Sequence, residues 1–346
     1  MRDIAKVDKN FKVETQINKA DITFFNACSA PFQICGLIHE NGKFRRMPEG
    51  VAKEVNDGVF GLHTQTAGGR LRFKTDSAYV AIHAKMSNLS KMPHMAFSGA
   101  IGFDLYVKKK HVGTYMPPTN IENGYENVIE FGVKKMREIT INFPLYSGVE
   151  ELYVGLQEGC KVLAPAPFKM EKPIVYYGSS ITQGGCASRP GTCYQGFVHR
   201  AIDADYINLG FSGSARAEKT ISDYVCGLDM SVFVYDYDHN APTVAHLAET
   251  HERMFLEVRE RHKDLPIIIM SRPKYALTDA EKERLAIIKR TYENAVARGD
   301  RNVYFIDGAT LMGVAKGEGT VDGCHPTDFG FYSMAQPLIK LLKRIL

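Results

Sequence analysis

The sequence predicts an all-β sandwich of jelly-roll type over residues 1–165, followed by a doubly wound α/β domain over residues 166–346. Apolar and polar residues alternate in the first half, whereas short unbroken apolar runs alternate with amphipathic stretches in the second. The length agrees, because 346 residues exceed one ordinary domain of roughly 100–200 residues. Between the halves, Leu163-Ala164-Pro165-Ala166-Pro167 is typical of a short, stiff connector.

Strands with one buried face account for the first half. The alternation of apolar and polar residues is clearest at 71–74, 103–108 and 139–143. Gly68-Gly69 and Ser147-Gly148 are turn sequences that separate such runs. No part of this half has a clear helical period, so we expect antiparallel sheets alone there, packed as a two-layer sandwich.

Parallel strands buried on both faces account for the second half. Five short apolar runs predict them, at residues 174–177, 206–209, 232–235, 267–270 and 303–306. Helical periods lie between the runs, and Thr278 with Glu281 has the pattern of a capping box at the start of one helix. The alternation predicts a three-layer domain with about five parallel strands, whose ligands bind beyond the carboxyl ends of the strands.

Composition and charge exclude several classes of protein. With 45% apolar and 24% charged residues, the chain is globular rather than disordered or collagenous. A net charge of +4, with Lys108-Lys109-Lys110 as the notable basic run, argues against nucleic acid as a partner. Residues 1–9 carry charges where a signal peptide needs about 7–15 apolar residues, and no window approaches the roughly 20 of a membrane helix. We therefore expect a soluble, cytoplasmic protein without a membrane partner.

The seven cysteines fit the same compartment. Their odd number and the lack of C-x-x-C pairs exclude a zinc ribbon and a disulfide scaffold, so we expect reduced thiols. If the natural chain starts with a leader that is removed, the protein is instead secreted or periplasmic, and Cys186 and Cys193 are close enough in sequence to pair.

The first strand of the second half is followed by a candidate nucleophile. Gly178-Ser179-Ser180 forms a tight, glycine-flanked turn from strand to helix, which presents Ser180 at the sheet edge. The alternative is a phosphate-binding or merely structural turn, although neither the P-loop nor the G-x-G-x-x-G pattern is present.

The last loop of the chain supplies partners for this serine. In Asp322-Gly323-Cys324-His325, the carboxylate of Asp322 is placed to accept Nδ1–H of His325, leaving Nε2 to take a proton from Ser180. The alternative is a helix-capping aspartate beside a surface histidine. A serine at another carboxyl end of the same sheet favours catalysis.

Two further loops offer donors for an oxyanion hole. Gly213 follows the second strand and Asn240 follows the third, and together with the Ser180 N–H they would supply three donors. Ser212 resembles a nucleophile elbow, but the G-x-S-x-G pattern fails because position 214 is serine.

Three neighbouring polar residues allow a second interpretation of the third loop. Asp236, Asp238 and His239 could ligate a metal ion. In an extended segment, however, neighbouring side chains point to opposite sides, and no second cluster completes a site, so we expect no metal.

With these four blocks in order, residues of about 170–346 resemble the SGNH (GDSL-like) hydrolase superfamily, in the branch with an N-terminal jelly-roll domain. The resemblance implies Ser180 as nucleophile, His325 as base, Asp322 as its orienting acid, and an oxyanion hole of Ser180, Gly213 and Asn240. The chain departs from the family pattern in two blocks. Ser179 replaces the usual Asp of the first block, and the third block retains only Asn240.

The resemblance implies a serine ester hydrolase that works through an acyl-enzyme and needs no cofactor. Two-domain members of this branch resemble carbohydrate acetylesterases, so we expect a small-molecule or oligosaccharide ester as substrate. A lipid or thioester acylhydrolase would share the same catalytic residues, and an inactive sugar-binding protein is the third interpretation. Which sugar or hydroxyl is deacylated, and the oligomeric state, do not follow from the sequence.

Overall fold

The computed structural model describes residues 13–346, and the residues on which the expectation about a signal peptide rests, 1–9, lie outside this range. The chain divides into two compact units. The first comprises the chain up to Arg46, Thr64–Pro167 and Ser188–Gly191, and the second comprises Met47–His63, Phe168–Ala187 and Thr192–Leu346. The predicted boundary at residues 165–166 is close to the passage from Pro167 to Phe168. A division into consecutive halves nevertheless misplaces residues 47–63 and 188–191.

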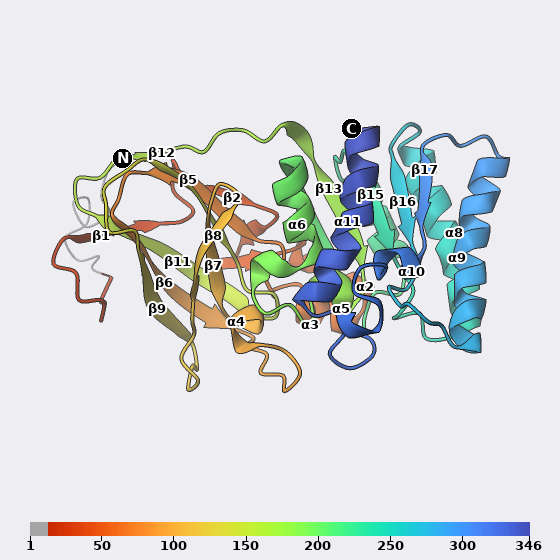
Figure 1. Ribbon diagram of the computed structural model, residues 1–346, viewed down its shortest axis with the longest axis horizontal. Helices are drawn as coiled ribbons and strands as arrows, with labels where there is room; N and C mark the ends of the chain where they lie inside the picture. Colours follow the sequence, from red (N-terminus) through yellow and green to blue (C-terminus); the bar gives the residue numbers. More distant parts are fainter. Residues whose placement is uncertain (1–12) are drawn as a thin grey trace. The chain divides into compact units, whose positions relative to one another are not determined.

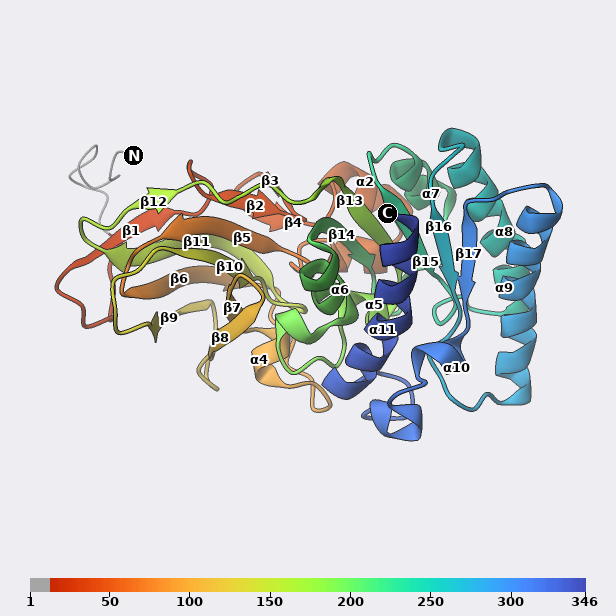
Figure 2. The same ribbon diagram turned by 45° about the horizontal axis from the view of Figure 1, so that its top comes forward.

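Two antiparallel sheets make up the first unit (Figure 2). One has the strand order β1 (Ile22–Asn26), β11 (Gly148–Gln157), β6 (Tyr79–Ser87) and β9 (Gly124–Glu130). The other has the order β12 (Val162–Leu163), β5 (Arg70–Thr75), β10 (Arg137–Asn142), β7 (Phe103–Val107) and β8 (Lys110–Tyr115), and β2 (Gln33–Cys35) also pairs with β5. Strands β3 (Ile38–Glu40) and β4 (Lys43–Arg45) form a separate hairpin. Apart from the hairpin of β7 and β8, strands β1 and β5–β11 alternate between the sheets as in a jelly roll, which confirms the predicted sandwich.

The alternation in the sequence produces the apolar rows of this unit. On the larger sheet, Ile141 pairs with Leu71 on one side and Leu105 on the other, and all three side chains are fully buried. The two sheets are also joined by hydrogen bonds, since the hydroxyl of Tyr115 on β8 donates to the carbonyl of Val80 on β6 at 3.1 Å. Period-two burial of this kind fixes the register, because a slip of one residue would expose the whole row.

Short helices interrupt the first half, so the expectation of sheets alone there is wrong. They are α2 (Glu49–Val55), α3 (Asp57–Leu62) and α4 (Phe97–Ala100). Helices of four to seven residues are shorter than the window of about 11–18 residues that reveals a helical period. Asn56 caps α3, because its side chain accepts the Val59 N–H at 2.8 Å.

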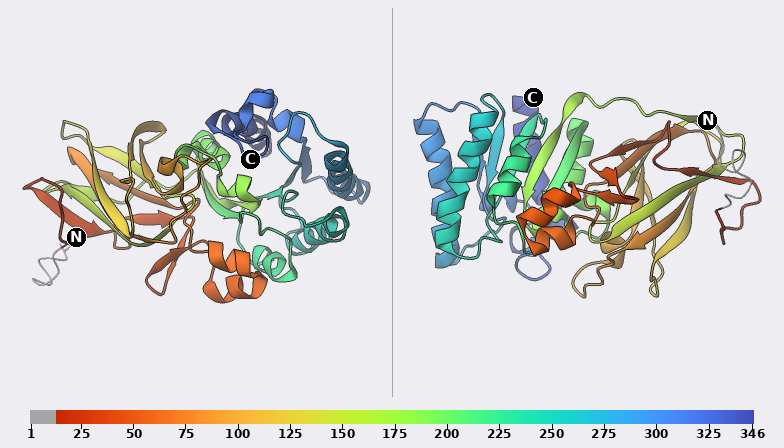
Figure 3. Two further views of the ribbon diagram at one scale, coloured as in Figure 1. Left: turned by 90° about the horizontal axis from the view of Figure 1, so that it is seen from below. Right: turned by 180° about the vertical axis from the view of Figure 1, so that it is seen from behind.

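Helices α2 and α3 belong to the core of the second unit. Ala52, Val55 and Val59 are buried there together with Ile221 of α7 (Lys219–Cys226). The left view of Figure 3 shows the orange helices α2 and α3 beside α7. Residues 47–63 therefore extend one helical layer of the α/β unit, although they lie in the middle of the β half of the sequence.

Five parallel strands form the sheet of the second unit, as predicted (Figure 1). Their order is β14 (Ala204–Gly210), β13 (Met170–Gly178), β15 (Val232–Asp236), β16 (Ile267–Met270) and β17 (Val303–Ile306). The helices of this unit are α5 (Ser180–Gln183), α6 (Tyr194–Ile202), α7, α8 (Val244–Arg261), α9 (Asp279–Ala297), α10 (Gly308–Leu311) and α11 (Asp328–Ile345), with 3₁₀ turns at Pro190–Thr192 and Lys316–Gly319. Among residues 13–346, no helix is long and apolar enough to cross a membrane.

The strand order places the topological switch point at β13. Strand β14 lies on one side of β13 and β15 on the other, so the connections after β13 and β14 leave toward opposite edges. Ligands of such sheets bind at this point, beyond the carboxyl ends of the strands. The capping box of α9 is confirmed, with Thr278 accepting the Glu281 N–H and Glu281 accepting the Thr278 N–H.

Candidate active site

Ser180 begins α5 directly after β13, on the tight turn that the sequence predicts. The residue before it, Ser179, is the N-cap of α5, and its side-chain oxygen accepts the Ile181 N–H at 3.2 Å. Gly178 is required by crowding, because a Cβ there would lie 2.2 Å from Thr182 Oγ1 and 2.4 Å from the Asp236 carbonyl. The replacement of the usual Asp by Ser179 therefore keeps a capping oxygen at this position.

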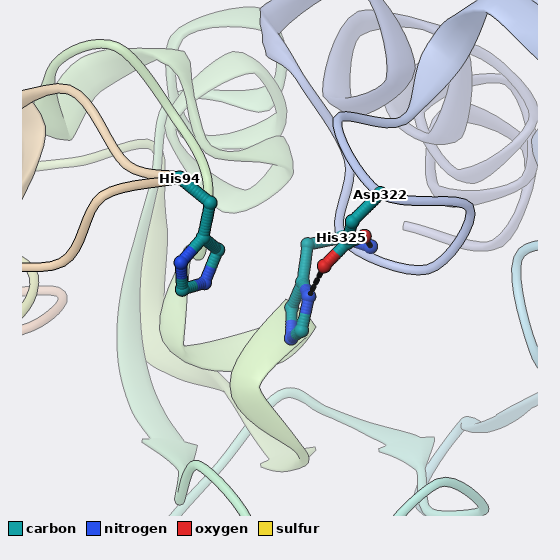
Figure 4. Close-up of side chains that lie close together, drawn as sticks. All are labelled: His94, Asp322 and His325. Atoms are coloured by element: carbon teal, nitrogen blue, oxygen red, sulfur yellow. Dashed lines mark hydrogen bonds and ion pairs between the residues drawn. The ribbon is translucent and has the colours of Figure 1, made fainter.

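Three side chains of the second unit form one chain of hydrogen bonds. The hydroxyl of Ser180 lies 2.9 Å from Nε2 of His325, and Nδ1 of His325 lies 2.7 Å from Oδ2 of Asp322. Figure 4 shows the second of these bonds, on the loop that precedes α11. With Nδ1–H donating to Asp322, Nε2 carries the lone pair that accepts the Ser180 proton.

The Asp322 carboxylate is held in its ionised form. Its partial burial would raise the pKa, but hydrogen bonds from the His325 ring and from the N–H groups of His325 and Cys324 outweigh that effect and lower the pKa to about 2. These two N–H groups donate to Oδ1 at 2.7 and 2.9 Å, while the ring uses Oδ2. A carboxylate fixed in this way orients the imidazole and stabilises the imidazolium.

Gly213 lies on the loop after β14, and this loop is tied to α5. Gln183, which is fully buried, accepts the Ser212 N–H at 3.0 Å. Gly210 approaches the same helix so closely that a Cβ there would lie 2.2 Å from the Gln183 nitrogen. At Gly213 the backbone has φ +68°, a conformation that favours glycine, and the space around it is open. Ser212 is held by its main chain, since its N–H donates to Gln183 and its carbonyl accepts from the Ser214 hydroxyl.

Asn240 lies on the loop after β15, and Arg284 of α9 holds that loop on both sides of it. Arg284 donates to the carbonyl of Asp238 at 3.0 Å and to that of Ala241 at 2.9 Å. Arg272 and Arg284 also pair with the buried Asp238 carboxylate, at 3.3 and 3.5 Å. The role of Asn240 as an oxyanion donor stays a prediction.

The three residues considered as metal ligands have other contacts. Asp236 accepts from Thr182 at 2.9 Å and from Tyr194 at 3.3 Å, and Asp238 is paired with arginine. Nδ1 of His239 lies 3.7 Å from the sulfur of Cys324. Within the described chain, Asp236, Asp238 and His239 do not gather as ligands around one point. Cys186 and Cys193 do not form a disulfide with each other.

A buried polar network behind Ser180 does not follow from the sequence motifs. Asp236 is at the end of β15, and burial raises its pKa to about 7, against the hydrogen bonds from Thr182 and Tyr194. The carbonyl of Thr182 accepts from Asn208 at 2.8 Å and from Gln195 at 2.6 Å. Polar residues at strand ends were the available signal, but their partners lie on other elements.

A small cavity adjoins the loop that carries Asp322. Its volume is about 110 Å³, and it is lined by His239, Arg272, Pro273, Lys274, Glu281, Asp322, Gly323 and Cys324. Arg272 and Lys274 are both paired with Glu281, at 3.0 and 2.8 Å. Burial, followed by the charges of Arg272 and His325, holds the pKa of His239 well below its usual value, so this ring is neutral.

Two family profiles match the chain. The profile of the GDSL-like Lipase/Acylhydrolase family matches residues 171–343. A second profile, named GxDLY and describing the N-terminus of Esterase_SGNH_hydro-type proteins, matches residues 22–162. The five-residue pattern in its name is present as Gly102-Phe103-Asp104-Leu105-Tyr106. No curated protein matches.

Solved structures similar to the chain extend over both of its halves. A protein assigned as a GDSL-like lipase, from Bacteroides ovatus ATCC 8483, is 26% identical with a TM-score of 0.84, covering 94% of this chain and 98% of its own. The salicylyl-acyltransferase SsfX3 from a tetracycline biosynthetic pathway has 18% identity, a TM-score of 0.78 and the same coverage. A family two carbohydrate esterase from Cellvibrio japonicus has 14% identity, a TM-score of 0.62 and again the same coverage. At these identities the last two show a shared fold alone.

Proposed function

Because the chain belongs to the GDSL-like lipase/acylhydrolase family, we propose that it is a serine ester hydrolase that removes acetyl groups from O-acetylated carbohydrates. One observation carries the proposal, the hydrogen-bond chain from Ser180 through His325 to Asp322. It supplies a nucleophile, a base and a group that orients the base, which is the set that acyl transfer requires.

The reaction proceeds in two steps. Ser180 Oγ bonds to the acyl carbon while its proton passes to Nε2 of His325, and the collapse of the tetrahedral intermediate expels the alcohol, which takes that proton. Water then attacks the acyl-enzyme, giving one proton to His325, and Ser180 recovers its proton as the acid leaves. Asp322 stays ionised and stabilises the imidazolium in both steps.

The negative charge that develops on the acyl oxygen needs donors. We assign the N–H groups of Ser180 and Gly213 and the side-chain amide of Asn240 to this role. The attachment of the Gly213 loop to Gln183 on α5 supports the assignment, since it ties this donor to the helix that begins with the nucleophile. The cycle requires no cofactor.

The finer part of the proposal is that the acyl group is short and that the alcohol released is a sugar. Residues 183–191, which follow the nucleophile, are mostly small or polar, and a long acyl chain would need an apolar lining. The carbohydrate esterase from Cellvibrio japonicus, with its shared two-domain fold, supports the same substrate class.

Two measurements test the proposal. Acetate release is measured from acetylated xylan, mannan and pectin fragments, with Ser180→Ala as the control, and we expect release by the wild type alone. Labelling of Ser180 by a fluorophosphonate separates an active hydrolase from an inactive sugar-binding protein. If the wild type is neither labelled nor active on any ester, the proposed function is wrong.

Chain length separates the acetylesterase from a lipid acylhydrolase. We expect nitrophenyl acetate to be hydrolysed faster than nitrophenyl octanoate, with both at matched concentrations below micelle formation. Faster hydrolysis of the octanoate would replace the carbohydrate substrate by a lipid or a long-chain thioester.

A further inference from the structure

The carboxylate of Asp104, in the GxDLY segment, lies at the centre of a buried cluster in the first unit. Its side chain is fully buried. Oδ2 accepts from Arg189 Nη1 and from the Gly191 N–H, both at 2.9 Å, and Oδ1 accepts from the Asn142 side chain at 2.7 Å. Two of these three donors belong to residues 188–191, which come shortly after the nucleophile in the sequence.

Tyr106 holds the same short segment. Its hydroxyl accepts a hydrogen bond from Arg189 and donates to the Gly191 carbonyl at 3.5 Å. The guanidinium of Arg189 lies over the tyrosine ring, 5.5 Å from its centre. The Asp and the Tyr of the motif therefore bind the same arginine and the same glycine.

Glycine is required on both sides of this contact. A Cβ on Gly191 would lie 2.6 Å from the Tyr106 hydroxyl and 2.8 Å from Asp104 Oδ2. A Cβ on Gly102, the first residue of the motif, would lie 2.5 Å from the carbonyl of Ser98, whose hydroxyl in turn donates to the Ser188 carbonyl at 2.7 Å. Three of the four named positions of GxDLY, Gly102, Asp104 and Tyr106, thus serve the approach of residues 188–191.

The flanks of this segment contact the loop of His325 and the first residue of the following helix, α11, within the second unit. On one side, the Cys186 N–H donates to the carbonyl of Pro326, the residue after His325, at 2.9 Å. On the other, the hydroxyl of Thr192 donates to Asp328 Oδ1 at 2.7 Å. Residues 188–191 are the stretch between these two attachments.

We propose that Asp104 and Tyr106 are positioning residues that fix residues 188–191 and, through Cys186 and Thr192, hold the loop of His325 in register with Ser180. In its activity readout this inference rests on the proposed function. It gives two residues of the first unit a part in catalysis that acts through the main chain of residues 186–192.

Asp104→Asn is the sharpest test, because it preserves shape and removes hydrogen-bonding capacity. An amide has one oxygen and one NH₂ group, so it cannot accept from Asn142 on one side and from Arg189 and Gly191 on the other. If the NH₂ group of the variant faces Arg189 and the Gly191 N–H, these donors lose their acceptor. If it faces Asn142, the Asn142 amide can flip to accept it, but in both orientations the charge that pairs with Arg189 is gone. Arg189→Gln, at a partly exposed side chain, is the second variant if Asp104→Asn does not fold.

Two readouts are combined. The first is kcat and KM on nitrophenyl acetate, where a misplaced base lowers kcat by about 10- to 100-fold with little change in KM. The second is the alkylation rate of Cys186 by iodoacetamide, followed by peptide mass spectrometry. Cys186 is buried, and burial, then Asp322, raises its pKa to about 12, so its alkylation is slow while the segment is held. We expect a severalfold faster rate in both variants.

Glu138→Gln is the matched control in the same sheet, since Glu138 contacts Arg72 at 3.7 Å and the Ala166 N–H at 3.2 Å. It should change neither readout. The proposal is overturned if folded Asp104→Asn and Arg189→Gln keep the wild-type kcat, if Cys186 stays protected in them, or if Glu138→Gln loses as much activity. Should the wild type hydrolyse no ester, the proposed function fails, while the Cys186 rates still decide whether the motif anchors the segment.

Discussion

Two carboxylates of this chain are surrounded by donors in the same way and yet behave differently. Asp322 accepts from two backbone N–H groups and from the His325 ring, whereas Asp104 accepts from one backbone N–H, the Asn142 amide and Arg189. Histidine exchanges a proton near neutral pH and arginine does not. The residue that pairs with the carboxylate, rather than the carboxylate itself, distinguishes the reactive cluster from the anchoring one.

The solvent exposure of the side chains also differs between the two clusters. The side chains of His325 and Asp322 are 24% and 38% exposed, and that of Asp104 is 0% exposed. A base must meet substrate and water, while an anchor holds best where water cannot compete for its hydrogen bonds. Changes in the first cluster should therefore stop the reaction and leave the fold intact.

Loss of the nucleophile gives the largest expected effect. Ser180→Ala should lower kcat by about 10⁶-fold, as removal of a catalytic serine does elsewhere. Its far-UV spectrum and melting temperature should match those of the wild type. Ser212→Ala, at the other serine of a glycine-rich turn, is the control and should retain most activity. A Ser180→Ala enzyme that keeps most of its turnover would contradict the assignment.

Loss of the base should be equally severe. His325→Ala should lose as much activity as Ser180→Ala, because the two side chains act as one unit. The double variant should be no slower than either single variant when kcat is measured on the same ester. A clearly slower double variant would mean that the two residues act separately.

The oxyanion donor gives a smaller effect. Asn240→Ala should lower kcat by roughly 10²–10³-fold with little change in KM, because its hydrogen bond strengthens as charge develops. Steady-state kinetics on a soluble acetyl ester provide the measurement. An unchanged kcat would show that Asn240 has no part in the reaction and that the loop after β15 is structural.

The pH dependence gives the mildest effect. Activity should fall as the pH is lowered from about 8 to 5, because the reaction needs an imidazole that can accept the Ser180 proton, and histidine in general gains a proton in this range. Asp322, with its pKa lowered to about 2, stays ionised over this range and does not cause the loss. Asp236, with its pKa raised to about 7, also titrates there, so Asp236→Asn is the control and should keep the acid limb. A flat profile would argue against a histidine base.

Regular periods and fixed spacings were the predictable part of the molecule. The jelly roll, the five parallel strands and the family are confirmed, and the Asp-x-x-His spacing does bring Asp322 to His325. Each of these predictions rests on residues that are close together in the sequence, on the period-two alternation of a strand, or on the alternation of strands with helices. Such patterns can be read from the sequence because neighbouring residues determine the local secondary structure.

Contacts between distant residues were the unpredictable part. Asp104 and Arg189 are 85 residues apart, and Thr182 and Asp236 are 54 apart, so no local pattern links them. Helices α2 and α3 are too short to show a period, and tertiary packing decides which unit they join. The same holds for residues 188–191.

Residues 47–63 lie in the first half of the sequence but belong to the second unit, so the two units cannot be separated by one cut in the gene. Expressing residues 168–346 alone would remove Ala52, Val55 and Val59 from a core that they help to close, and would leave their apolar neighbours facing water. Exposed apolar patches of this kind promote association of unrelated chains. We therefore expect a fragment cut at the proline-rich connector to aggregate, so that a separately expressed second unit has to include residues 47–63.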